Sequence, residues 1–172
     1  MYQMRKAVDV NSNAPEFAAR DVRGTEFNIA TFRGRNNLVI FFYRNSRCQT
    51  CREELKNLAD YYGYISQQDG EVVAISTDNL DEAKNLAVDL KLPFRVISDP
   101  EHRIADLYGV FDTTTDTAYP ALFLIDKNGV VRYRKIIEGL NDLVPGSDVA
   151  NRLRDMGPGM GSHGGFNPRP SP

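Results

Sequence analysis

The hydrophobic pattern of this chain changes its period around residue 43. Residues 38–43 are apolar without interruption (Leu-Val-Ile-Phe-Phe-Tyr), which is typical of a strand buried on both faces of a sheet. Beyond residue 48 the apolar residues instead recur three or four positions apart, as one face of a helix requires. They are Cys51, Leu55, Leu58, Ala59, Tyr62 and Ile65. The pattern therefore predicts a central strand that leads directly into an amphipathic helix.

Strand and helix patterns keep alternating after this first pair. Residues 72–76 predict a second strand, and a strand-helix-strand unit of this length implies a parallel, right-handed crossover. A helix is expected over 81–90 and a short strand over 94–97. The chain is therefore assigned to the α/β class.

The start of the following helix is predicted from a local motif. Ser98 is followed by Pro100 and Glu101, so that serine and glutamate stand three apart as in a capping box, with proline in the first turn. This helix is expected to begin here and to end at Gly109.

A β-hairpin is expected near the end of the alternation. The apolar segment 121–125 and the segment 130–137 flank residues 126–129 (Asp-Lys-Asn-Gly), and the Asn-Gly pair is typical of a hairpin turn. An antiparallel pair would thus join the parallel strands, and a last helix is expected over 147–154.

Composition and charge limit the classes of protein that the chain can represent. With 172 residues, 41% hydrophobic content and a net charge of -2, we expect one soluble domain with a sizeable core. Basic residues are interspersed with acids, so we expect no nucleic-acid partner. No apolar run approaches the ~20 residues needed to cross a bilayer, so no membrane association is expected. Residues 1–17 lack the apolar core of a secretory signal, which favours the cytoplasm.

Three segments are expected along the chain. Residues 1–13 are polar and predict an N-terminal arm, and residues 14–155 carry the alternating pattern of the domain. Residues 156–172 are rich in glycine and proline, and such a composition buries too little apolar surface to fold. We therefore expect a disordered tail there.

The two cysteines of the chain form the sequence Cys48-Gln49-Thr50-Cys51, between the central strand and the helix. The N-terminus of a helix favours anions, and the thiolate is the reactive form of cysteine. If Cys48 is the non-helical cap, the two sulfurs lie on one face, and Cys51, one turn in, is the more buried. The arrangement favours a redox pair.

Three other uses of a cysteine pair are weaker explanations. A structural disulfide would close a very short loop and so stabilise the fold little. A zinc site needs about four ligands, and the chain adds only His102 and His163, which are far apart. Two inert, buried thiols are the third possibility. We expect neither a metal nor another cofactor.

Several fragments, in this order and spacing, resemble the alkyl hydroperoxide reductase C/thiol-specific antioxidant family, the peroxiredoxin-like branch of the thioredoxin superfamily. The fragments are residues 14–17, the strand 41–43 leading to residues 51–54, residues 98–110 and residues 123–129. The resemblance covers about residues 14–140. It implies a thioredoxin fold, with a central mixed sheet flanked by helices and an N-terminal peroxiredoxin-like extension.

The cysteine motif departs from this family's pattern. Peroxiredoxins usually present Pro-x-x-x-Thr-x-x-Cys, in which the threonine and a distant arginine position the peroxide. In that register Cys51 takes the peroxidatic place, Arg44 replaces the proline and Cys48 replaces the threonine. The position usually held by the distant arginine is Pro120. The groups that would bind peroxide are therefore missing.

Pro120 instead resembles a feature of thioredoxin-like oxidoreductases. In these proteins a cis-proline at the start of the corresponding strand faces the two cysteines and helps to hold a substrate. Tyr119 and Pro120 are accordingly expected to position the substrate, with a cis bond between them, which costs little before proline. A trans proline that enters a strand is the alternative.

The resulting hypothesis is a thiol-disulfide oxidoreductase. Cys48 attacks a protein or small-molecule disulfide and Cys51 resolves the mixed disulfide, with an external thiol as the final reductant. Three nearby arginines are expected to support the Cys48 thiolate electrostatically: Arg44, Arg47 and Arg52.

Two other functions remain open at this point. The first is an antioxidant thiol peroxidase in which peroxide oxidises Cys51 and Cys48 then resolves it. The second is a non-enzymatic redox sensor whose cysteine pair changes a binding surface. The direction of exchange depends on a reduction potential that the sequence does not supply.

Overall fold

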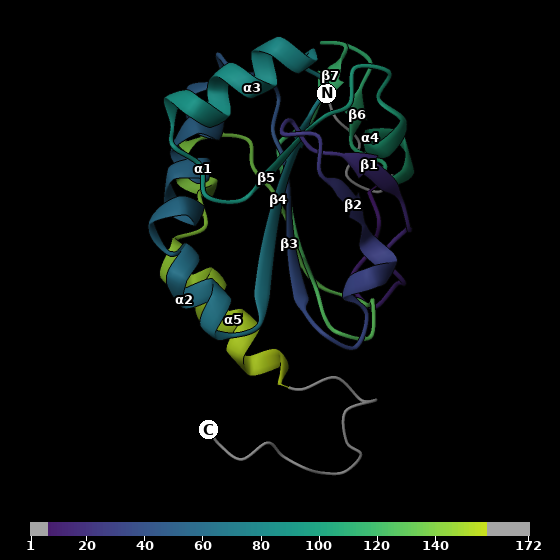
Figure 1. The fold of residues 1–172 in the computed structure, drawn as a ribbon, viewed down its shortest axis with the longest axis vertical. Coiled ribbons are helices and arrows are strands. Elements are labelled where there is room, and N and C mark those ends of the chain that lie inside the picture. The colour runs from purple at the N-terminus through teal and green to yellow at the C-terminus, as the bar shows by residue number, and fades with distance from the viewer. Residues whose placement is uncertain (1–6, 158–172) are drawn as a thin grey trace.

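The computed structural model of the chain describes residues 7–157, and a five-stranded sheet runs through its centre (Figure 1). Helices α1, α2, α3 and α5 cover one face of the sheet. Helix α4 and two small hairpins, β1-β2 and β6-β7, lie on the other face. The α/β class expected from the alternating pattern is confirmed.

The order of the strands in the sheet is β5-β4-β3-β8-β9. Their bounds are β3 Asn37–Phe42, β4 Gly70–Ser76, β5 Arg95–Ser98, β8 Ala121–Ile125 and β9 Val131–Ile136. Strand β3 pairs in parallel with β4 and antiparallel with β8, so the sheet is mixed, as predicted. All six residues of β3 are buried, which explains its uninterrupted apolar run.

The remaining elements cover the two faces. The helices on the first face are α1 Gln49–Asp60, α2 Tyr62–Gln67, α3 Leu80–Asp89 and α5 Gly146–Met156. The elements on the second face are β1 Ala18–Arg20, β2 Glu26–Asn28, α4 Arg103–Leu107, β6 Phe111–Asp112 and β7 Thr117–Ala118. Short 3-10 turns occupy Ile29–Phe32 and Leu140–Asp142.

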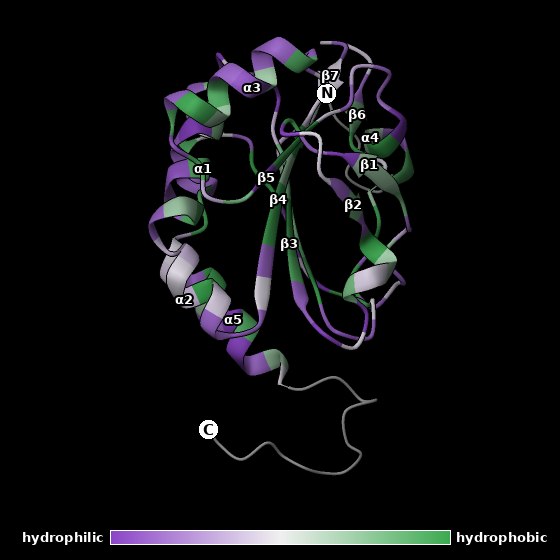
Figure 2. Ribbon diagram, viewed as in Figure 1, coloured by the Kyte–Doolittle hydropathy of each residue, from purple (hydrophilic) through white to green (hydrophobic). Residues whose placement is uncertain are grey.

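Alternation along β3 divides the interior into two cores. Val39 and Phe41 point toward α1, α3 and α5, whereas Ile40 and Phe42 point toward α4 and the small hairpins, because successive side chains leave opposite faces of a strand. Apolar residues accordingly concentrate along the central strands (Figure 2). The central strand is thus packed on both faces.

The helix predicted after the cysteines is divided in two. Helix α1 ends at Asp60, and Tyr61 has non-helical angles before α2 begins. The start of α5, at Gly146, packs closely against this break. A Cβ added to Gly146 would lie 2.5 Å from Tyr61 Cδ1 and 2.6 Å from the Asn57 carbonyl oxygen. The period of the apolar residues continues across the break and therefore did not indicate it.

The capping box predicted at Ser98 is wrong. Helix α4 begins at Arg103, and the Asp99 carboxylate accepts hydrogen bonds from the Ile104 and Ala105 N–H groups, both at 3.0 Å. The Ser98 hydroxyl instead donates to the carbonyl of Asp78 at 2.6 Å. Asp99 lies before the helix in sequence, and the chain turns back between Asp99 and Arg103 because His102 adopts a left-handed conformation with φ 49°. This turn brings the Asp99 carboxylate to the first N–H groups of α4.

The hairpin predicted around residues 126–129 is confirmed. Strands β8 and β9 pair antiparallel, and the Gly129 N–H donates to the Asp126 carbonyl at 2.9 Å. Gly129 supplies the positive φ of this turn, at 82°. Glycine adopts such an angle without the steric cost that a Cβ imposes.

The segment expected as an N-terminal arm is described from residue 7 and lies against the domain. The Val8 N–H donates to Tyr108 O at 3.1 Å, and the Asn11 N–H donates to Val131 O at 2.7 Å. Arg134 on β9 also donates to the carbonyls of Ala7 and Val8. The predicted tail lies outside the described residues from residue 158 onward, His163 included.

Candidate active site

The two cysteines lie where the central strand passes into α1. Cys48 is the N-cap of α1, with φ -75° and ψ 108°, and its Sγ accepts a hydrogen bond from the Cys51 N–H at 3.2 Å. Both cysteines are free thiols in the structure. The predicted cap position of Cys48 is therefore confirmed, and the first turn of the helix is directed at its sulfur.

The two thiols differ in exposure. Cys51 is fully buried, with 0% of its surface exposed, whereas Cys48 is only partly buried. This order was expected, because Cys51 lies one turn inside the helix on its apolar face. A substrate approaching from outside meets Cys48 first.

The electrostatics of the pair also separate the two thiols. The pKa of Cys48 is lowered to about 6, and the largest cause is a hydrogen bond from the Cys51 thiol. Two backbone N–H groups and the Arg44 charge lower this pKa further, whereas burial opposes them. The same hydrogen bond, together with burial, raises the pKa of Cys51 far above its ordinary value. Near neutral pH the pair therefore holds a thiolate at Cys48 and a protonated thiol at Cys51.

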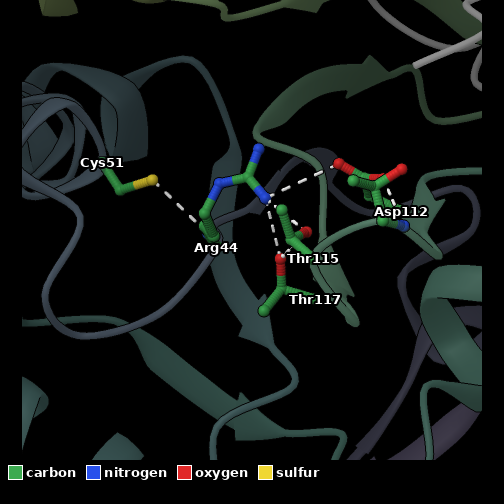
Figure 3. A network of polar contacts seen from close by, with 6 residues as sticks. Arg44, Cys51, Asp112, Thr115 and Thr117 are labelled. Atoms are coloured by element: carbon green, nitrogen blue, oxygen red, sulfur yellow. Dashed lines mark hydrogen bonds and ion pairs between the residues drawn. The ribbon is translucent and has the colours of Figure 1, made fainter. Parts of the chain in front are cut away.

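The three arginines expected near the pair have different contacts. Arg44 contributes to the lowered pKa of Cys48, and its side chain extends to the β6-β7 hairpin (Figure 3). Arg52 donates to the Ser46 carbonyl at 2.8 Å and pairs with Asp89 on α3 at 2.7 Å. Arg47 is exposed, and its charge acts on Asp78. Of the three, Arg44 has the most direct connection to the sulfurs.

Tyr119 and Pro120 lie at the same end of the sheet as the cysteines. Ala121 pairs with Phe42, so the next step of the antiparallel register brings Pro120 opposite Tyr43, where the cysteine segment begins. The Tyr119 ring lies beneath the Arg44 guanidinium, 5.2 Å from its Cζ. The sheet thus brings Tyr119, Pro120 and the cysteine segment to one edge.

The cis bond predicted before Pro120 is wrong. No peptide bond among residues 7–157 is cis, so the Tyr119-Pro120 bond is trans. The Pro120 carbonyl accepts from the Ile137 N–H at 2.9 Å and extends the pairing of β8 with β9. Proline is tolerated at this entry to a strand because no hydrogen bond is needed from its nitrogen.

Two buried carboxylates beside the site were missed by the sequence reasoning. Burial is the largest cause that raises the pKa of Asp78, at the carboxyl end of β4, to about 6. Burial likewise raises the pKa of Glu54, one turn after Cys51, to about 7. Asp78 lies two residues after the predicted strand 72–76, and that position at the shared edge of parallel strands could have indicated it.

Glu54 joins α1 to the segment before α5. Its Oε1 accepts a hydrogen bond from the Val144 N–H at 2.8 Å, and the whole side chain is buried. Its Oε2 is also buried and has no hydrogen-bond partner within residues 7–157. Glu54 lies three residues after Cys51 and four before Leu58, on the apolar side of the helical pattern, and this spacing could have indicated its burial.

Neither a metal site nor a membrane span is found among residues 7–157. They contain no group of three or more His, Cys, Asp and Glu side chains placed to hold a metal ion. No helix within the same range has the length and apolar character to cross a membrane.

A mixed sheet with a partly exposed N-cap cysteine and a buried second cysteine is the arrangement of a thiol-redox protein of the thioredoxin fold. Residues 10–134 match the model of the AhpC/TSA family. The chain belongs to the AhpC/TSA family.

The similar curated proteins fall into two groups. Peroxiredoxin Q of Oryza sativa subsp. japonica is 31% identical over 127 residues, which are 73% of this chain and 58% of that protein. The thiol-disulfide oxidoreductase ResA of Geobacillus thermodenitrificans is 29% identical over 158 residues, 90% of this chain and 82% of that protein. The chain thus spans less than two thirds of the first of these relatives. Family membership supports thiol-dependent redox activity without choosing between the two groups.

Solved structures support the same fold. Enterococcus faecalis AhpC superposes with a TM-score of 0.74 at 21% identity, covering 86% of this chain and 91% of that one. A 2-Cys peroxiredoxin of Plasmodium vivax superposes with a TM-score of 0.73 at 20% identity, covering 87% and 96%. The predicted thioredoxin fold of peroxiredoxin type is confirmed.

Proposed function

We propose that this protein is a thiol-disulfide oxidoreductase in which Cys48 is the attacking thiolate and Cys51 the resolving thiol. The observation that carries the proposal is the division of the pair. Cys48 is partly exposed with a pKa lowered to about 6, and Cys51 is buried and protonated. Attack on a disulfide needs an accessible thiolate, and resolution needs a second thiol behind it.

The reaction proceeds in two exchanges. The Cys48 thiolate attacks one sulfur of the substrate disulfide, forms a mixed disulfide and releases one substrate thiolate. Cys51 then loses its proton to solvent and attacks Cys48 Sγ, which forms the Cys48-Cys51 bond and releases the second substrate thiolate. Two electrons pass from the dithiol to the substrate, and solvent protonates the released thiolates.

The surroundings of Cys48 fit a docked disulfide. Tyr119 and Pro120 lie at the same edge of the sheet and are proposed to position a protein or small-molecule substrate. Arg44, Arg47 and Arg52 are proposed as electrostatic support, with Arg44 foremost because its charge lowers the pKa of Cys48. An external thiol reductant, as the cytoplasm supplies, is proposed to restore the dithiol.

The second candidate is a thiol peroxidase. It is favoured by the similarity to peroxiredoxin Q and to alkyl hydroperoxide reductase E of Mycobacterium bovis. The latter is 26% identical over 131 residues, which are 75% of this chain and 86% of that protein. In that reaction Cys51 would attack peroxide and Cys48 would resolve it. The raised pKa and complete burial of Cys51 argue against this order. We therefore rank disulfide exchange above peroxide reduction.

Reduction of insulin disulfides, with dithiothreitol as the reductant, tests the choice. The wild-type protein should accelerate the reaction, and Cys48→Ser should abolish the acceleration. In a separate incubation without dithiothreitol, Cys51→Ser should trap a mixed disulfide on Cys48, visible by mass spectrometry as an adduct that later addition of dithiothreitol removes. Rapid oxidation of Cys51 by hydrogen peroxide in Cys48→Ser, with no turnover of insulin by the wild type, would instead establish the peroxidase.

A further inference from the structure

Arg44 connects the cysteine segment to the β6-β7 hairpin through both of its ends (Figure 3). Its backbone N–H donates to Cys51 Sγ at 3.4 Å. Its Nη1 donates to Thr115 Oγ1 at 2.6 Å and to Thr117 Oγ1 at 2.9 Å, and lies 3.7 Å from Asp112 Oδ2. The residue that contacts the buried sulfur is therefore anchored to a separate element of the fold.

The anchor is preorganised and partly shielded from water. The hydroxyls of Thr115 and Thr117 are hydrogen-bonded to each other at 2.7 Å, and the side chains of Arg44 and Asp112 are 25% and 11% exposed. The Tyr119 ring covers the guanidinium. A charge held in such a setting is screened less than one that is free in solvent.

The contacts of Arg44 oppose the burial of Cys51 once Cys48 has reacted. In the free dithiol, Cys51 donates its thiol hydrogen to the Cys48 thiolate, and that negative charge keeps Cys51 protonated. A mixed disulfide at Cys48 carries no thiolate, so both effects are lost. Burial then raises the pKa of Cys51, and the N–H and the positive charge of Arg44 lower it.

We propose that Arg44 is a positioning residue for the second exchange, acting on Cys51, and that the β6-β7 hairpin holds it in place for that step. The inference rests on the proposed function. The N–H and charge of Arg44 stabilise the Cys51 thiolate after its proton has passed to solvent. That thiolate forms a bond to Cys48 Sγ, and the bond from Cys48 to the substrate sulfur breaks and releases a thiolate.

A two-phase experiment separates the exchanges. Reduced protein is mixed with dithiodipyridine, an uncharged disulfide, and the absorbance of released thiopyridone is followed by stopped flow. One equivalent is released when Cys48 attacks and a second when Cys51 resolves. At about pH 8, Cys48 is ionised with or without the Arg44 charge, so the first phase reports little of that charge.

Removal of the guanidinium should slow the second phase selectively. A rise of one unit in the pKa of Cys51 lowers the fraction of thiolate about tenfold while its pKa lies above the pH. The more basic thiolate is about threefold more nucleophilic, so the rate of the second phase falls about threefold. Arg44→Met should therefore slow the second phase about threefold for each unit by which the pKa of Cys51 rises, and the first phase less than about twofold. Thr115→Val with Thr117→Val, which keeps Arg44 but removes its hydroxyl partners, should slow the second phase in the same selective way.

Arg134→Met is a matched control, because Nη1 of Arg134 also joins separate segments, contacting the carbonyls of Ala7 and Val8 and the Asp9 carboxylate. It should leave both phases unchanged. Equal slowing of both phases by Arg44→Met, or no slowing of the second, overturns the role of Arg44. Release of fewer than two equivalents by the wild type would instead refute the exchange mechanism itself.

Discussion

The backbone N–H of Cys51 donates to Cys48 Sγ at 3.2 Å, so the first turn of α1 binds the sulfur that the proposed reaction uses as its nucleophile. The side chain of Cys51 contributes a second hydrogen bond to the same sulfur. The resolving residue is thus also the main stabiliser of the attacking thiolate. A mutation that removes the Cys51 side chain but keeps its backbone N–H separates the two contributions to the pKa of Cys48.

Replacing the Cys51 side chain should raise the pKa of Cys48. Alkylation by iodoacetamide in the wild type should increase with pH around a midpoint of about 6. Cys51→Ala keeps the backbone N–H but removes the largest stabilising hydrogen bond, so the midpoint should rise by about one unit or more. Cys48→Ser should react very slowly, because Cys51 is buried. An unchanged midpoint in Cys51→Ala would contradict this account.

Glu54 should make the fold less stable as the pH rises. Burial raises its pKa in the folded protein to about 7, above the unfolded value, so the folded state binds more protons over that interval. The contribution of Glu54 to the free energy of unfolding is therefore favourable below about pH 4 and decreases up to about pH 7. Urea unfolding of Glu54→Gln should show a smaller loss of stability between pH 5 and pH 8, by on the order of 1–2 kcal/mol. Identical pH profiles for the two proteins would show that this carboxylate is not the cause.

Gly146→Ala should destabilise the protein even though alanine favours helices. The new Cβ would lie 2.5 Å from Tyr61 Cδ1 and 2.6 Å from a backbone oxygen, and such overpacking costs about 1–3 kcal/mol. Gly63→Ala, in α2, is the matched control because nothing lies within 4 Å of its Cβ position. It should stabilise by about 0.5–1 kcal/mol. Thermal unfolding should shift in opposite directions for the two variants, and a shift in the same direction would contradict the packing described at α5.

Asp99→Ala should destabilise the start of α4. The carboxylate accepts from two buried N–H groups, those of Ile104 and Ala105, and leaving them without a partner costs about 2 kcal/mol. Asp99→Asn keeps an acceptor oxygen and should cost less. Chemical denaturation of both variants checks the order, and a larger loss in Asp99→Asn would be the contrary result. Ser98→Ala, at the residue first expected to cap this helix, should not reproduce the loss at α4.

Sequence reasoning succeeded where the local pattern and the packing agree. The uninterrupted apolar run 38–43 identified the central strand, and the helical spacing beyond residue 48 identified both the cap position of Cys48 and the deeper position of Cys51. It failed at Ser98, where a local motif competes with a carboxylate that reaches the helix across a turn. It failed also at Pro120, where the pairing of β8 with β9 accommodates a trans bond.

The sequence by itself determined the alternating elements and the two cysteines at the head of a helix, because these depend on residues near one another in the chain. It also determined the family, because the order and spacing of short motifs carry that resemblance. Only the tertiary structure decided what surrounds those cysteines. Arg44 meets Thr115 and Thr117 across more than 70 positions of sequence, and Glu54 meets Val144 across 90. No periodicity encodes such contacts, since they depend on how the sheet orders its strands and on which side chains burial then forces together.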